Sequence, residues 1–458
     1  MKTVLRFCTI IVACVFVALS ASGQIGRRFP SEKKIIPDPV TGVPLTFLTS
    51  TPAGDSKIYQ THPQWTADGK WVIFRSARVP GQVMAVNEAS GAIVQVTEQG
   101  YMGMLCVAQH SMTLYLMRDA GPLSANAAAA TADGTGKKGE GMNRPRGPFQ
   151  IVAVDLAGIF ADSERGSMKP AASYERVCGT TPPEMRAGGD MALDANEDFA
   201  YFRFTGGDLA RRLPADTPIA AAYGPRGMGA GPAGLASLNL KTGETKFIVA
   251  VPFQIGHVQT NPFVPGEIVF CWETGGKAPQ RTWLVQSDGT GLRPLYPEAT
   301  DEWVTHEAVV TRDEVVLAVM GHRKPGTSDP WGIAGTREHP TGLGVVNLRT
   351  REMRMIAQTP SGSGLWHVHG SADGRWAVGD DFSRSIYLID RHSGEMLLLS
   401  TGHKATAADH PHPSFNADGT KIHIESALLS ADDRAMNICI IPVPEAWLKR
   451  PRAPRVSP

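Results

Sequence analysis

Two histidines stand two positions apart in the stretch ADHPHPSFNADGT, which covers residues 408–420. Side chains at positions i and i+2 of an extended segment point to the same face, so His410 and His412 can reach one point in space. Imidazole is a common ligand of divalent metals, and two ligands from one segment suit a single ion. Because the whole chain has only 13 histidines, this pair is the first candidate for chemistry.

Histidines recur at a matching distance before other Asp-containing turns. A single histidine ahead of a strand is more often a turn or capping residue, but a repeated register in a histidine-poor chain argues against that interpretation. Converging imidazoles without a polar partner would be costly to desolvate and would repel one another once protonated, whereas a bound divalent cation removes that problem. The histidines in register are His62, His367 and His412, six residues before Asp68, Asp373 and Asp418, and His306, seven residues before Asp313.

The segments that must position these histidines are predicted to be strands. Short apolar runs bounded by Gly, Asp and Asn recur along the chain, and no long amphipathic helix pattern appears. Two modules alternate: an Asp-Gly-type turn followed by a strand, as in HPQWTADGKWVIF from His62, and two strands joined by a Ser/Thr-Gly-type turn, as in VMAVNEASGAIVQVT from Val83. One pair of modules supplies about four strands over roughly 40–60 residues, which is the size of a propeller blade.

The modules predict an all-β fold, a seven-bladed β-propeller with TolB-like blades, formed by residues 36–450 as a single domain. The strand VPLTFLTS from Val43 is expected to complete the last blade and so join the two ends of the domain. Because the first strand of each blade lines the central channel, residues just before these strands converge at the channel mouth. The blades are expected to begin near Thr61, Gly100, Gly189, Gln259, Thr305, His367 and His410.

The N-terminus predicts a secretory signal peptide over residues 1–23. Lys2 and Arg6 precede an apolar run that ends at Leu19, and small residues follow. The run is too short for a spanning helix, so we expect a periplasmic or secreted protein with no membrane contact after cleavage. Residues 451–458 are expected to form a C-terminal tail.

The composition excludes some classes of partner. The chain has 45 basic and 44 acidic residues, a balance that provides no field for nucleic acid or a membrane surface. The cysteines that remain after signal cleavage are expected to be mostly buried thiols, with one disulfide left open, and no Cys-x-x-Cys pair occurs. They are Cys106, Cys178, Cys271 and Cys439. The oligomeric state is not indicated.

Several common catalytic motifs are absent from the sequence. His306-Glu307 is not followed by the second histidine of a His-Glu-x-x-His zinc motif. No Gly-x-Ser-x-Gly nucleophile motif and no glycine-rich phosphate loop occur. The acidic pair Asp380-Asp381 is interpreted as a solvated turn.

The motifs around these histidines resemble those of the oligogalacturonate lyases. They include EWVTHEAVV from Glu302, WHVHGSADGRWAVGDD from Trp366 and DHPHPSFNADGTKI from Asp409. Members of this family are seven-bladed propellers that cleave short pectin fragments by β-elimination. The resemblance implies a carbon–oxygen lyase acting on uronate-containing oligosaccharides.

Carried over position by position, the resemblance implies a divalent metal, typically manganese, held by His367, His410 and His412. It implies His306 of the Thr-His-Glu motif as the catalytic base and Arg281 as the essential arginine. β-Elimination removes the C5 proton of a uronate, alpha to its carboxylate, and a Lewis acid and a guanidinium at that carboxylate would stabilise the developing charge. A neutral imidazole can accept the proton.

One position departs from the family pattern. The family's fourth metal ligand is a glutamine three residues before the first histidine of His-Pro-His, and that position here is Ala407. His369, Asp409, water or the substrate could complete the site; alternatively, the metal or the uronate substrate differs.

Other residues are candidates for substrate contacts, each with a structural alternative. His62 is either a substrate contact or a turn residue, and the tryptophans can stack on a sugar ring, although packing between blades is their more common use. The candidates are His62, His369, Trp303 and Trp366. A second interpretation of the whole chain also stays open: a noncatalytic TolB-like propeller that binds a protein or peptide at the channel mouth.

Overall fold

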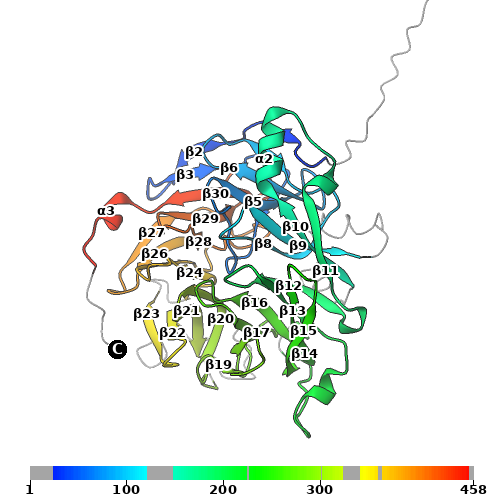
Figure 1. The fold of residues 1–458 in the computed structure, drawn as a ribbon. Helices are drawn as coiled ribbons and strands as arrows, with labels where there is room; N and C mark the ends of the chain where they lie inside the picture. Colours follow the sequence, from blue (N-terminus) through cyan, green and yellow to red (C-terminus); the bar gives the residue numbers. More distant parts are fainter. Residues whose placement is uncertain are drawn as a thin grey trace, which may run out of the picture.

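The computed structural model describes residues 24–120, 148–223, 226–300, 302–322, 341–358 and 364–452. Its strands form seven antiparallel sheets of four or five strands each. The sheets follow one another around a ring, with one edge strand of each sheet toward the centre (Figure 1). The predicted all-β, seven-bladed propeller is confirmed.

The strands of each blade are given from the innermost outward, and in the first and seventh blades the outer strands come from the start of the chain. The first blade contains β4 (Asp55–Lys57), β5 (Trp71–Ser76), β6 (Gln82–Asn87), β7 (Ile93–Gln95) and the added outer strand β1 (Arg28–Phe29). The second contains β8 (Met102–Val107), β9 (Thr113–Asp119), β10 (Phe149–Asp155) and β11 (Glu175–Thr180). The third contains β12 (Ala187–Leu193), β13 (Phe199–Phe204), β14 (Ala230–Asn239) and β15 (Thr245–Phe253).

The remaining blades follow the same order. The fourth contains β16 (Ile255–Thr260), β17 (Glu267–Trp272), β18 (Thr282–Gln286) and β19 (Arg293–Pro294). The fifth contains β20 (Glu302–Thr311), β21 (Glu314–His322), β22 (Gly342–Asn347) and β23 (Met353–Ala357). The sixth contains β24 (Val368–Gly370), β25 (Trp376–Asp380), β26 (Ile386–Asp390) and β27 (Met396–Ser400). The seventh contains β28 (Ser414–Phe415), β29 (Lys421–Ser426), β30 (Asn437–Pro442), β3 (Pro44–Phe47) and β2 (Lys34–Pro37).

The ring is closed by the strand that was expected to close it. β3 pairs with β30 in antiparallel register, with Thr46 opposite Ile440 and Phe47 opposite Cys439. Phe47 is fully buried in one apolar cluster with Trp376 and Trp447, which come from the sixth blade and the short helix α3 (Glu445–Leu448). β3, near the start of the chain, and β30, near its end, are therefore held together by backbone pairing and by apolar burial.

The Asp-Gly turns recur because each is stabilised by hydrogen bonds within the turn itself. In the first blade, Asp68 Oδ1 accepts hydrogen bonds from the Thr66 hydroxyl and the Lys70 amide, and Gly69 follows with φ 68°. Asp373 and Asp418 make equivalent contacts in the sixth and seventh blades. A positive φ is accessible to glycine at no steric cost, so the Asp-Gly pair marks the hairpin between the first two strands of a blade.

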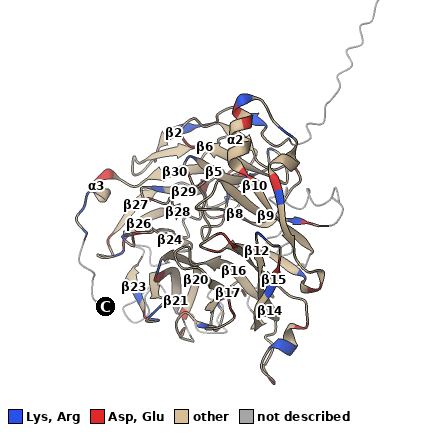
Figure 2. Ribbon diagram, viewed as in Figure 1, with Lys and Arg blue, Asp and Glu red and all other residues tan. Residues whose placement is uncertain are grey.

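The described cysteines are free thiols. All four cysteines of the described part are buried and unpaired, so no disulfide joins them. The expected signal peptide, residues 1–23, lies outside the described residues, and only residues 451–452 of the expected tail lie within them. No helix among the described residues is long and apolar enough to span a membrane. Acidic and basic residues are interspersed around the ring (Figure 2).

Among the described residues, helices are few and lie outside the inner strands of the ring. α2 (Leu156–Arg165) follows the third strand of the second blade and is capped by Asp155, whose side chain accepts a hydrogen bond from the Gly158 amide. The single-turn 3₁₀ helices are η1 (Ala171–Ser173), η2 (Pro183–Met185) and η3 (Leu209–Arg212). None of these residues belongs to the histidine cluster described below.

Candidate functional site

Four histidines from three neighbouring blades meet at the start of the inner strands. The ring centroid of His367 lies 3.8 Å from that of His412, 4.2 Å from that of His306 and 5.5 Å from that of His410. His306 belongs to β20, His367 directly precedes β24, and His410 and His412 lie four and two residues before β28. The register seen in the sequence therefore brings the predicted base and the three predicted metal ligands together.

The backbone at this cluster is held in an uncommon conformation. His306 and His412 have positive φ angles of 52° and 48°, and His257 of the fourth blade has 50°. A left-handed conformation costs a non-glycine residue about 1–3 kcal/mol and tends to persist at functional sites. In β20 a bulge lies between Thr305 and Ala308. A bulge inserts one extra residue into a strand, which accounts for the spacing of seven rather than six residues between His306 and its turn.

Asp380 orients two of the imidazoles. Its carboxylate accepts a hydrogen bond from the His410 ring at Nδ1 (3.0 Å) and one from the His367 backbone amide (2.8 Å), and the His367 Nδ1 lies 3.3 Å from Oδ1. Asp380 is fully buried at the end of β25, so its interpretation as a solvated turn is wrong. The acid was misjudged because strand β25 runs back toward the start of β24 and ends beside the histidines.

The third predicted ligand is oriented by a backbone carbonyl. The Nδ1–H of His412 donates to the carbonyl oxygen of His410 (2.8 Å), and Glu425 Oε1 lies 3.4 Å from the same nitrogen. Burial lowers the pKa of His412, but the nearby Asp409 and Glu425 carboxylates outweigh burial and raise the pKa. In His367, His410 and His412, Nδ1 faces a hydrogen-bond acceptor. The lone pair on Nε2 is therefore the one available to a metal.

The groups of potential ligand atoms differ in part from the predicted set. His367 and His410 group with Asp380, while His412 groups with Asp409 and Glu425, each group having its ligand atoms within 4.8 Å of one another. Imidazole and carboxylate donors of this kind suit Mn²⁺ or another first-row divalent ion. The residues present therefore fit a metal, with both carboxylate sets beside the three histidines.

His306 has the features of a neutral base. Its Nδ1–H donates to the carbonyl oxygen of Trp366 (2.6 Å), and its ring meets the Trp366 ring edge-on at 4.5 Å. Burial, followed by the nearby His367 and Arg281, holds the pKa of His306 well below its usual value. The ring therefore stays neutral near pH 7, and its Nε2 carries a lone pair.

Arg281 lies in a buried network of opposite charges. Its Nε donates to Glu307 Oε2 (3.0 Å), and its Nη2 lies 3.6 Å from Glu273 Oε2. Burial raises the pKa of Glu307, but Arg281 and His257 outweigh burial and lower it to about 2, so the carboxylate is ionised. The guanidinium plane is thus fixed by Glu307.

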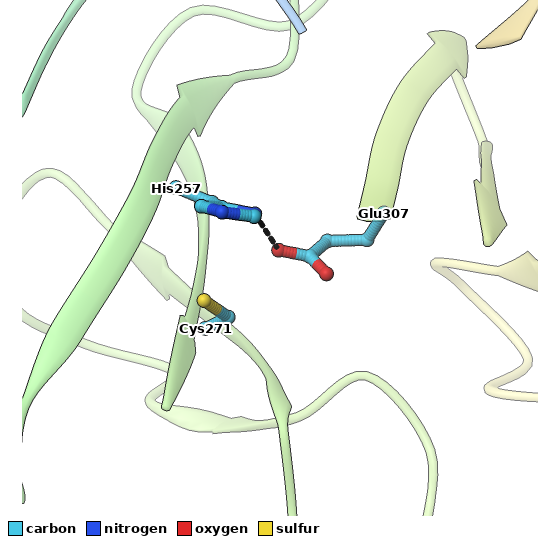
Figure 3. Close-up of side chains that lie close together, drawn as sticks. All are labelled: His257, Cys271 and Glu307. Atoms are coloured by element: carbon cyan, nitrogen blue, oxygen red, sulfur yellow. Dashed lines mark ion pairs between the residues drawn. The ribbon is translucent and has the colours of Figure 1, made fainter. Parts of the chain in front are cut away.

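His257 was missed by sequence reasoning, although it joins this network. Its Nδ1 and Nε2 lie 3.4 Å from Glu307 Oε1 and Glu273 Oε2, and Figure 3 shows the ring directed at Glu307 with Cys271 beside them. His257 lies in a bulge of β16, in nearly parallel contact with His306 (centroids 6.0 Å apart, 22°). The register count could not find it, because the corresponding turn of the fourth blade is Pro-Gly and has no aspartate from which to count.

The possible ligand atoms of His257, Cys271 and Glu307 lie within 4.8 Å of one another, close enough to hold one metal ion. The Arg281 guanidinium, however, lies within 3.2 Å of the His257 ring and already pairs with Glu307. A divalent cation placed there would meet a fixed positive charge, so this group is better understood as the support of Arg281.

Tyr59 is a second residue that the motifs did not indicate. It extends from the first blade, and its ring lies 5.0 Å from that of His257, 5.3 Å from that of His412 and 6.2 Å from that of His367. The tyrosine of the first blade therefore lies beside histidines of the fourth, sixth and seventh blades.

Comparisons with known proteins address the same resemblance. The chain is 24% identical over 212 residues to the oligogalacturonate lyase of Dickeya dadantii and to the oligogalacturonide lyase of Pectobacterium atrosepticum, a match that covers 41% of this chain. The match spans half the length of each of these curated relatives. No protein-family model matches the chain.

Solved structures agree with the sequence comparison. An oligogalacturonate lyase in complex with manganese superposes with a TM-score of 0.68 at 19% identity, over 93% of this chain and all of the other. The oligogalacturonate lyase of Vibrio parahaemolyticus gives 0.67 at 18% identity, over 93% of this chain and again all of the other. The chain is similar to oligogalacturonate lyases. The resemblance first seen in the motifs is thereby confirmed, and these two structures share its fold.

The structure shows what surrounds Ala407, where the oligogalacturonate lyase pattern has a glutamine. Ala407 is buried in a small apolar cluster with Ala427 and Met436 and offers no ligand atom. Of the residues considered as replacements, Asp409 lies in the His412 group, whereas the His369 Nδ1 accepts a hydrogen bond from the Phe415 amide (3.2 Å). Asp409 is therefore the better placed of the two.

The remaining residues that were predicted to contact the substrate have different surroundings. Trp366 is half-buried and touches His306 and His410, so the structure brings it to the cluster. Trp303 is buried in β20, near its start. His62 is buried, and its Nε2 lies 2.9 Å from the carbonyl oxygen of Met191 in β12, a contact typical of a structural histidine.

Proposed function

We propose that the protein is a metal-dependent lyase that cleaves short galacturonate-type oligosaccharides by β-elimination and leaves a 4,5-unsaturated uronate. The observation that carries the proposal is the convergence of His306, His367, His410 and His412 with their Nδ1 atoms turned toward acceptors of the protein. The similarity to oligogalacturonate lyases in sequence and fold supports this function.

The metal we propose is Mn²⁺, held by His367, His410 and His412. The manganese complex of the similar lyase supports this choice, and Asp409 is the candidate for a further oxygen ligand. A divalent ion at the substrate carboxylate would act as a Lewis acid and stabilise the negative charge that develops when the C5 proton leaves.

The protein's own residues perform the remaining steps. His306 accepts the C5 proton at Nε2, because its Nδ1–H is engaged with the Trp366 carbonyl. Arg281 directs N–H donors toward the uronate carboxylate, since Glu307 holds its Nε edge in place. The bond between C4 and the glycosidic oxygen then breaks, the leaving oxygen takes up a proton from water, and His306 returns the C5 proton to the solvent.

The assay follows ultraviolet absorbance of the conjugated product. Purified protein is incubated with oligogalacturonate and with other uronate oligosaccharides, with and without chelator. We expect absorbance to rise with at least one uronate, to stop with chelator and to return with added Mn²⁺. Failure with every uronate, in protein that contains no metal, would exclude a lyase. Bound metal without turnover would favour the noncatalytic propeller.

His257 is expected to act as a positioning residue for Arg281. His257→Ala removes the ring between Glu273 and Glu307, and a shift of Arg281 by about 1 Å can lower kcat/KM by roughly a hundredfold. His257→Asn tolerates a left-handed backbone and retains a hydrogen-bond donor, so it should recover part of the activity. Metal content should be unchanged in both variants, and its loss would assign His257 to the metal site.

The place of action is also a proposal. The N-terminal segment of residues 1–23 supports export to the periplasm or beyond the cell. Fractionation of cells that express the full chain tests this directly, with a variant lacking residues 2–23 as the control.

A further inference from the structure

The turn between β25 and β26 lies against the segment that carries His410. Because β24 and β25 are antiparallel, with Val368 opposite Gly379, this turn emerges on the face where His367 is located. It comprises residues 381–385, in which Asp381 is buried, Ser383 is exposed, and Phe382, Arg384 and Ser385 are half-buried. None of these residues belongs to the predicted metal or catalytic set.

The turn is held in one shape by its own hydrogen bonds. The Asp381 and Ser385 backbones are joined by a bond of 3.1 Å, and the Asp381 carboxylate accepts a second bond from the Ser385 amide (2.9 Å). The Arg384 amide donates to the Asp381 carbonyl oxygen (2.9 Å). Arg384 itself has φ 62°, an uncommon conformation for a long side chain, so the turn presents Arg384 in a fixed position at an energetic cost.

The half-buried side chains of Phe382 and Arg384 both approach the site. The ring of Phe382 lies 5.3 Å from that of Trp366 and 6.4 Å from that of His410. Arg384 donates from Nε to the carbonyl oxygen of Asp409, the residue before His410 (3.3 Å). An aromatic pair and a guanidinium are thus placed beside the proposed metal ligands.

The position of Arg384 in its blade parallels that of Arg281. Arg281 directly precedes the third strand of the fourth blade, β18, and Arg384 lies two residues before the third strand of the sixth blade, β26. Arg281 is buried and paired with Glu307, whereas Arg384 is half-buried, with its Nε bonded to a neutral carbonyl. The Asp380 and Asp409 carboxylates act on Arg384 electrostatically, but its Nε donates to a neutral carbonyl rather than to a carboxylate.

We propose that Phe382 and Arg384 form a subsite for the sugar next to the reacting uronate, with Arg384 binding the carboxylate of that neighbouring sugar. The proposal rests on the proposed function, because the substrate there is an oligosaccharide with one carboxylate on each uronate. Trp366 and Phe382 provide apolar faces for the sugar ring, and Arg384 provides paired donors that match carboxylate geometry. The turn thereby selects acidic over esterified neighbours.

The test compares Arg384→Asn with the wild-type, metal-loaded protein. Asparagine tolerates the positive φ, so the substitution removes the guanidinium without adding backbone strain. The substrates are digalacturonate and digalacturonate whose non-reacting sugar is methyl-esterified. We expect the KM of the variant for the free acid to rise about tenfold, corresponding to the loss of one charge-assisted contact, with kcat nearly unchanged and the KM for the ester unaffected. Ser383→Ala is the matched control and should behave as wild type.

Two results would overturn the subsite. An equal change for both substrates would show that Arg384 does not read the neighbouring carboxylate, and a fall in kcat at constant KM would place Arg384 in the chemical step. Calorimetric titration of the His306→Asn variant and of the His306→Asn, Arg384→Asn double variant with digalacturonate measures binding without turnover. If the wild-type protein yields no unsaturated product, the proposed function fails, and these titrations still decide whether Arg384 binds the uronate.

Discussion

Replacing His306 with asparagine is expected to lower kcat/KM for uronate elimination by about 10²–10⁴-fold, the usual contribution of a general base. The amide of asparagine can still donate to the Trp366 carbonyl, which otherwise would remain buried without its partner. Asparagine also tolerates the φ of 52° found at this position. The substitution therefore removes the basic nitrogen and leaves the local fold in place.

The same variant separates a base from a metal ligand. The ring of His306 lies 4.2 Å from that of His367, a separation between the 3.8 Å and 5.5 Å that separate His367 from the other two proposed ligands. If His306 is the base, His306→Asn should bind as much metal as the wild-type protein, measured by elemental analysis after gel filtration. Metal loss in parallel with activity would instead make His306 the fourth ligand, in place of the glutamine that the family has at position 407.

The low pKa of His306 also gives the direction of the pH response. Because burial and the neighbouring positive groups lower this pKa, the neutral form persists as the pH falls below the usual histidine range. As the pH falls, an enzyme with this base should therefore lose activity at a lower pH than an enzyme whose base is a solvated histidine.

The fold could be predicted from the sequence because its signals are local. The Asp-Gly turns with hydrogen bonds inside the turn mark the first hairpin of several blades, and the seven predicted starts differ from the observed inner strands by at most six residues, Thr61 against Asp55. The closing strand was predicted for the same reason, since VPLTFLTS alternates like a strand and precedes a complete set of modules. The additional outer strands β1 and β2 carried no such signal.

The site could be predicted only where it shares the turn register. His306, His367 and His412 could be counted from an aspartate, but His257 could not, because its blade uses Pro265-Gly266. Asp380 and Tyr59 reach the histidines through strand pairing and across the channel, which spacing along the chain does not reveal. The residues that support the histidines can therefore be identified only once the strands are paired and the ring is closed.

Asp380 is expected to control metal affinity more than any other residue outside the ligand set. Its carboxylate faces the Nδ1 atoms of both His367 and His410, and such outer partners typically change metal affinity by about 10–100-fold. Asp380→Asn keeps one oxygen acceptor, but its amide N–H then faces the Nδ1–H of either His367 or His410, so two donors oppose each other. We expect the concentration of Mn²⁺ needed for half-maximal activity to rise by that factor, while activity at saturating Mn²⁺ is largely restored.

Asp381→Asn is the matched control for this prediction. Asp381 is adjacent and also buried, but its carboxylate accepts a hydrogen bond from the Ser385 amide within its own turn, and asparagine preserves that acceptor. Metal titration followed by activity and by calorimetry should therefore separate the two variants, with Asp381→Asn close to wild type. Equal metal affinity in both variants would mean that Asp380 does not orient the ligands. In that case, the His412 group with Asp409 and Glu425 would be the metal-binding set, because it is the other group in which carboxylates and an imidazole of this cluster come within 4.8 Å.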